Sequence, residues 1–123
     1  MPTAATLPEA QRLARAEAFA LPLDQIDVTK PRLFQDDTIG HYFERLRRDD
    51  PVHWHRNDFY GPFWSVTRYQ DIMAVDTNHA VYSSDWTQGG IALFDGPMDE
   101  RLQMFIAMDP PKHDDQRKSV SAI

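Results

Sequence analysis

The clearest periodic pattern in the chain lies just after the acidic pair at residues 36–37. Large apolar residues recur there three or four positions apart, at Ile39, Tyr42, Phe43 and Leu46. That spacing places their side chains on one face of a helix and leaves charged residues on the other. Because proline cannot continue a helix, Pro51 ends the pattern, and we predict a helix over residues 38–49.

Two short β-prone runs follow this helix, at residues 52–56 and 63–67. The segment between them contains Asn57, Asp58, Gly61 and Pro62, which are turn-forming residues. The arrangement predicts a hairpin over residues 52–67, with a half-exposed first strand that buries Trp54. A further apolar stripe predicts a helix over residues 68–77 with Tyr69, Ile72, Met73 and Val75 buried, and residues 81–84 suit a short strand.

Regular patterning stops at Asp85 and resumes only near the end of the chain. Glycine and proline residues interrupt this stretch, which also carries apolar side chains at Ile91, Leu93 and Phe94. Long loops of this kind are more often functional than neutral. Asp109 then precedes two prolines, as an N-cap precedes a first helical turn, and we predict a final helix from residue 110.

These elements predict a mainly α fold with a small β-sheet, of the α+β class. Residues 1–35, which begin with an alanine-rich stretch, are expected to form a partly mobile leader. Residues 36–123 are expected to form part of a single domain: a helix, a hairpin, a helix, a long loop and the start of another helix. Because the last helix has no stop signal, we expect the molecule to continue beyond Ile123.

The amino-acid composition argues against several classes of function. The 13 basic and 19 acidic residues give a net charge of −6, so the basic surface typical of nucleic-acid binding is missing. No window approaches the roughly 20 apolar residues needed to span a bilayer, and residues 1–20 contain no continuous apolar stretch of the kind that a secretory signal requires. The sequence has no cysteine, which excludes disulfides and cysteine-based metal sites within it and is compatible with a cytoplasmic location.

The pair His113 and Arg117 is the strongest candidate for binding chemistry. Four residues apart on a helix, the two side chains project from one face. An imidazole N–H and a guanidinium fork suit a ligand with two carboxylates. The alternative is that Arg117 pairs with Asp114 one turn earlier and that His113 is merely solvated.

A second constellation is His53-x-His55, which places two imidazoles on the same side of a strand. Two histidines are a possible metal pair, but the other histidines, His41, His79 and His113, lack ligand spacing. A half-exposed strand with ordinary histidines explains the pattern better than a metal site.

The context of the His113–Arg117 pair resembles the cytochrome P450 superfamily of haem-thiolate monooxygenases. Residues 109–117 (DPPKHDDQR) are similar to an Asp-Pro-Pro-x-His-x-x-x-Arg segment in its bacterial soluble members. Residues 50–55 (DPVHWH) resemble the family's first strand, residues 64–72 (WSVTRYQDI) its second strand and next helix, and residues 82–84 (YSS) a short strand. The resemblance runs from about residue 36 to the end and implies the N-terminal portion of the P450 fold.

By this resemblance, His113 and Arg117 bind the two propionates of haem b. The stretch from Thr87 to Met108 corresponds to a loop over the distal side of the haem, and Ile91, Leu93 and Phe94 are candidates for substrate contact. Residues 86–91 (WTQGGI) and 105–108 (FIAM) resemble the bacterial branch that hydroxylates the ends of alkane and fatty-acid chains. An apolar loop suits such substrates, which offer few polar handles.

The resemblance further implies a parent enzyme that inserts one atom of O₂ into an apolar substrate. Its electrons would come from a ferredoxin and an NAD(P)H-dependent ferredoxin reductase. The family's axial cysteine and catalytic residues lie outside this chain, so no catalytic residue is assigned and the isolated chain is expected to be inactive. The alternatives are a non-enzymatic module that binds an apolar ligand or a protein, and a metal-dependent module that uses His53 and His55.

Overall fold

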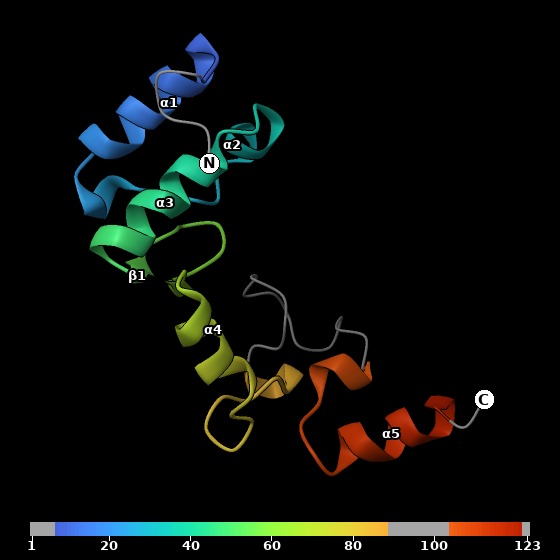
Figure 1. The fold of residues 1–123 in the computed structure, drawn as a ribbon. Coiled ribbons are helices and arrows are strands. Elements are labelled where there is room, and N and C mark those ends of the chain that lie inside the picture. The colour runs from blue at the N-terminus through green and yellow to red at the C-terminus, as the bar shows by residue number, and fades with distance from the viewer. Residues whose placement is uncertain (1–6, 89–103, 122–123) are drawn as a thin grey trace. The chain divides into compact units, whose positions relative to one another are not determined.

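A computed structural model describes residues 7–88 and 104–121 of the chain (Figure 1). Over these residues the protein is mainly helical with one two-stranded sheet, which confirms the predicted fold class. The described chain separates into two compact units: unit 1 contains residues 7–55 and 64–68, and unit 2 contains residues 56–63, 69–88 and 104–121. None of the described helices is both long and apolar enough to cross a membrane.

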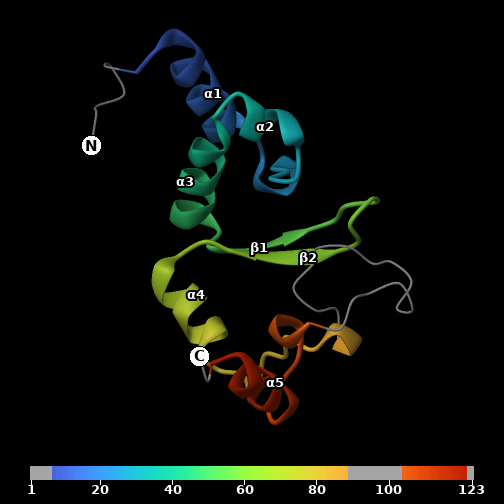
Figure 2. The same ribbon diagram turned by 90° about the vertical axis from the view of Figure 1, so that its right-hand side faces the viewer.

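Unit 1 is built on helix α1 (Glu9–Ala20), the 3-10 turn η2 (Leu23–Gln25), helix α2 (Pro31–Gln35) and helix α3 (Ile39–Asp49) (Figures 1 and 2). Helix α1 packs against α3. The buried core between the elements of this unit consists of Ala18, Ile26, Val28, Tyr42 and Leu46. The helix predicted over residues 38–49 is therefore confirmed, because its apolar stripe supplies two core residues and two that pack against the core.

The first 35 residues contribute to this core. Ala18 of α1 is fully buried, and Ile26 is 3% exposed. Arg15 of α1 donates to Glu44 of α3, with Nη2 and Oε1 2.8 Å apart. The expectation of a leader ending at residue 35 stays a prediction, but its described part, residues 7–35, is largely helical and packs within unit 1. Alanine-rich sequence alone does not show this, because only the facing helix decides which alanine is buried.

The predicted hairpin is confirmed by strands β1 (Val52–His55) and β2 (Phe63–Val66), which pair with each other. The prediction that the first strand buries Trp54 is wrong. His53 and His55 are buried, whereas Trp54 is 39% exposed and its ring lies 4.7 Å from that of Trp64. Side chains alternate between the two faces of a strand, so the sequence pattern identified the strand but not which face lies against the core.

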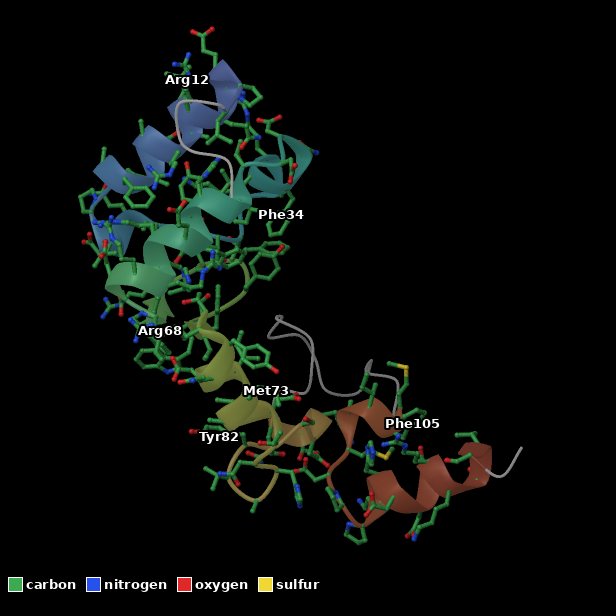
Figure 3. The ribbon with its side chains drawn as sticks, viewed as in Figure 1. Arg12, Phe34, Arg68, Met73, Tyr82 and Phe105 are labelled. Atoms are coloured by element: carbon green, nitrogen blue, oxygen red, sulfur yellow. The ribbon has the colours of Figure 1, made fainter. Side chains whose placement is uncertain are left out.

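Unit 2 contains helix α4 (Tyr69–Asp76), the 3-10 turns η3 (Trp86–Gln88) and η5 (Phe105–Ala107), and helix α5 (Lys112–Ser121). Figure 3 labels Met73 on α4 and Phe105 in η5. Helix α4 confirms the helix predicted over residues 68–77, but its predicted buried face is wrong, since Tyr69 is 75% exposed. Residues 81–84 form turn and irregular backbone rather than the predicted strand, and the final helix begins at Lys112 rather than at residue 110.

The two buried histidines of β1 lie against each other. Their ring centroids are 4.5 Å apart and nearly perpendicular, and His53 Nδ1 is 2.7 Å from an oxygen of Asp50. Burial lowers the pKa of His55, and the charge of His53 lowers it further, against opposing effects of Asp27, Asp50 and the Ile26 backbone. Over the described residues, no three or more His, Cys, Asp or Glu side chains are grouped to hold a metal ion, so the metal-module alternative gains no support.

Leu46→Ala should lower the free energy of unfolding of unit 1 by about 2–5 kcal/mol, because it removes a fully buried side chain from a small core. Denaturant unfolding followed by circular dichroism measures the loss. Leu13→Ala on α1 truncates a side chain that is 65% exposed, and this matched control should change the same quantity by less than about 0.5 kcal/mol. Equal effects of the two substitutions would contradict the core described above.

The buried His55 should make stability depend on pH. Its pKa is lowered in the folded state, so below the ordinary histidine pKa of about 6.5 the unfolded state binds more protons than the folded state. The free energy of unfolding should therefore fall as the pH drops through about 6.5 toward the lowered pKa. Chemical unfolding at stepped pH measures this slope. His55→Gln should flatten it, whereas His79→Gln, at an exposed position, should not; equal slopes in wild type and His55→Gln would refute the explanation.

Candidate functional site

Helix α5 carries the two residues that the sequence singled out. His113 and Arg117 occupy its second and sixth positions, four residues apart, so their side chains leave the same face of the helix. The backbone of the first turn is fixed by a hydrogen bond in which the His113 N–H donates to the Asp109 carbonyl, at 3.1 Å. The structure therefore brings the predicted pair together on one ordered element.

The His113 ring is held against the turn that precedes the helix. Its Nδ1 lies 2.8 Å from the Phe105 carbonyl oxygen, and its ring meets the Phe105 ring edge to face, with centroids 5.7 Å apart. A carbonyl oxygen only accepts hydrogen bonds, so Nδ1 must carry the proton. This contact fixes Nδ1 as a donor and leaves Nε2 as the ring nitrogen that can face a ligand, to which it donates only when it also carries a proton.

The Arg117 side chain is exposed, and its guanidinium forms no ion pair with another described residue. The alternative pairing of Arg117 with Asp114 is thus not formed within residues 104–121. The Arg117 guanidinium, which has no ion-pair partner among residues 7–88 and 104–121, and a protonated Nε2 of His113 lie on adjacent turns of one helix and would form a donor set for two carboxylates of a single ligand.

Asp109 departs from its predicted role as a simple helix cap. Its carboxylate accepts hydrogen bonds from the Ser83 hydroxyl and from the Ser84 backbone N–H, the second at 2.8 Å. These partners lie 26 and 25 residues earlier in the chain. The sequence offered no signal for this contact, because no local spacing relates an aspartate to serines so distant along the chain.

The segment that Asp109 contacts is itself ordered by hydrogen bonds. The Asp85 N–H donates to the Ser83 hydroxyl oxygen at 3.0 Å, and the Thr87 N–H donates to an Asp85 carboxylate oxygen at 2.8 Å. The hydroxyl and backbone N–H of Thr87 lower the pKa of the Asp85 carboxyl, and the charge of Lys112 lowers it slightly further. The charge effect indicates that the first residue of α5 lies near this segment.

An open pocket of about 490 Å³ in unit 2 also borders His113. Its lining includes three carboxylates, Asp76, Asp109 and Asp114, and does not include Arg117. Three neighbouring negative charges disfavour an anionic ligand, so the candidate site is the face shared by His113 and Arg117 rather than this pocket. A larger open pocket of about 760 Å³ lies in unit 1 and contains neither residue.

The three candidates for substrate contact, Ile91, Leu93 and Phe94, lie outside the described residues. Their assignment stays a prediction. The described residues that flank this segment are the turns η3 and η5, and Phe105 of η5 is the residue whose backbone carbonyl holds the His113 ring.

Known proteins resemble this chain in sequence and in fold, although no protein-family model matches it. Linalool 8-monooxygenase of Pseudomonas putida is 28% identical over 109 residues, which cover 80% of this chain and 26% of that protein. The solved structure of CYP153D17 from Sphingomonas sp. PAMC 26605 has a TM-score of 0.69 and 41% identity, covering 81% of this chain and 25% of that one. Cytochrome P450-153 from Novosphingobium aromaticivorans has a TM-score of 0.65 and 33% identity, covering 77% and 27%. The chain thus spans about a quarter of the length of these relatives.

Proposed function

Since about four fifths of this chain carries cytochrome P450 sequence and fold, the chain belongs to that superfamily, and we propose that it forms part of a haem-dependent monooxygenase. The pair on α5 carries the proposal: His113 and Arg117 share one face of the helix, and among the described residues no ion pair occupies the Arg117 guanidinium and no hydrogen bond is formed at His113 Nε2. Haem presents two propionates, which match such a pair. When bound, thiolate-ligated haem iron supplies the oxygen chemistry.

Each of the two residues has a distinct role in this proposal. Arg117 would hold one propionate through its planar guanidinium, whose charge is permanent. His113 donates its Nδ1–H to the Phe105 carbonyl, so Nε2, when it carries a proton, would donate to the second propionate. The contact with Phe105 therefore orients the ring before the ligand arrives.

A thiolate ligand to the haem iron would have to come from outside these residues, because the sequence contains no cysteine. We accordingly propose that the isolated 123-residue chain is inactive and that activity belongs to an assembly that includes the thiolate. Such an enzyme, placed in the bacterial cytoplasm, would take electrons from a ferredoxin and an NAD(P)H-dependent ferredoxin reductase. Resemblance to soluble bacterial members of the family supports these assignments.

The substrate class that we propose is apolar, with oxygen inserted at the end of an alkane or fatty-acid chain. The supporting features are the likeness of residues 86–91 and 105–108 to that branch and the apolar residues Ile91, Leu93 and Phe94 between them. A hydrocarbon chain has no polar group to grip, so it is held by shape and by burial of its surface.

A non-enzymatic binding module is the rival function, and exposed aromatic residues favour it. Phe59 is 71% exposed and Trp64 is 60% exposed. Large exposed apolar side chains mark surfaces that contact a partner. The same residues would also suit a surface that the rest of a P450 covers. The two functions therefore differ in whether this chain, joined to the rest of a P450, gives a protein that binds haem.

A chimeric protein distinguishes the haem monooxygenase from the binding module. Replacing the matching quarter of CYP153D17 with this chain is feasible because the two share 41% identity over that portion. We expect the purified chimera to retain haem and its reduced carbon monoxide complex to show the Soret band of a thiolate-ligated haem. A chimera with native-like circular dichroism but without haem would favour the binding module.

Within this chimera, Arg117→Ala should weaken haem retention by about 1.5–3 kcal/mol, because a charge-assisted hydrogen bond to a propionate is lost. Haem transfer to excess apomyoglobin measures the rate of loss. Lys118→Ala is the matched control, since it removes a neighbouring exposed cation from the same helix. Unchanged haem loss after Arg117→Ala would remove Arg117 from the site.

A further inference from the structure

We propose that Asp109 is a positioning residue that sets the segment 83–87 and the first turn of α5 relative to each other, an inference that rests on the proposed function for its relevance to haem. The carboxylate of Asp109 accepts from Ser83 and Ser84, while its backbone carbonyl accepts from the amide of His113. Asp109 thus contacts both segment 83–87 and helix α5, which carries His113 and Arg117.

The two prolines explain why this carboxylate reaches so far. An aspartate before a helix normally accepts from the backbone amides of the first turn. Pro110 and Pro111 have no N–H to offer, so the first amide that a carboxylate at this position could accept is that of Lys112. The Asp109 carboxylate accepts instead from Ser83 and Ser84.

Further hydrogen bonds connect Asp109 to the rest of segment 83–87. Ser83 donates its hydroxyl to Asp109 and accepts the Asp85 amide, while Asp85 in turn accepts from Thr87. On the helix side, His113 is held at its amide by Asp109 and at its ring by the Phe105 carbonyl. Loss of the Asp109 carboxylate should loosen segment 83–87 and the His113 helix together.

Adjacent serines provide a matched pair of variants in the 123-residue chain. Ser83 contributes its hydroxyl, whereas Ser84 contributes its backbone amide and needs no side chain for the contact. Asp109→Ala should speed hydrogen exchange of the Ser84 amide roughly tenfold, as expected from losing a bond to a charged acceptor. Ser83→Ala should act in the same direction, Ser84→Ala should not, and Ser83→Thr should restore the wild-type rate.

Two-dimensional NMR resolves the exchange of these individual amides. Ser84 exchange that is unchanged by Asp109→Ala, or equal effects of Ser83→Ala and Ser84→Ala, would overturn the proposal. The rescue by threonine shows that the contact needs the hydroxyl, which threonine keeps. The comparison of Ser83→Ala with Ser84→Ala separates this contact from a general loss of stability, because both substitutions remove one hydroxyl group.

The haem-loaded chimera tests the positioning role. Asp109→Ala and Ser83→Ala should increase the rate of haem loss severalfold relative to Ser84→Ala, and Ser83→Thr should match wild type. If haem loss responds to Arg117→Ala but not to Asp109→Ala, the positioning role is overturned and the proposed function stands. If the chimera binds no haem, the proposed function fails, and the role of Asp109 toward haem fails with it, whatever the amide exchange shows.

Discussion

A shortage of buried apolar side chains constrains every other feature of the described chain. Over residues 7–88 and 104–121, the buried hydrophobic residues are Ala18, Ile26, Val28, Tyr42, Leu46, Ala107 and Met108. Five of them belong to unit 1 and only the last two to unit 2. Burying one large aliphatic side chain contributes about 1.5–3 kcal/mol, so the described residues of unit 1 form a small hydrophobic core, and those of unit 2 contribute two buried apolar side chains.

Polar contacts accompany this burial in both units. In unit 1 the Arg15–Glu44 pair is partly exposed, so solvent screens it and it contributes less than the burial of Leu46. In unit 2 the Ser83 hydroxyl and the Ser84 amide donate to the Asp109 carboxylate in an exposed setting. Among the described residues, these hydrogen bonds link segments that lie 25 and 26 residues apart, whereas the buried apolar residues of the unit, Ala107 and Met108, directly precede Asp109.

Because few apolar side chains are buried among the described residues, several large aromatic and aliphatic side chains are exposed. Trp64 on the hairpin and Tyr69 and Ile72 on α4 have apolar side chains of the size that normally lies inside a protein. The chain spans about a quarter of the length of its P450 relatives. In the proposed monooxygenase, further protein would cover such surfaces. The orientation of His113 does not depend on that cover, because the Phe105 carbonyl holds its ring and the Asp109 carbonyl accepts from its amide.

Local spacing in the sequence was enough to predict several elements and the candidate pair. The stripe from Ile39 to Leu46 specified α3, turn-forming residues specified the hairpin, and the four-residue interval placed His113 and Arg117 on one face of α5. Three features follow from packing instead: which face of β1 is buried, which alanine of α1 enters the core and where the Asp109 carboxylate binds. The physical reason is distance along the chain: helical period and turn chemistry act over a few residues, whereas burial and the Asp109 contacts depend on partners about 25 or more residues away.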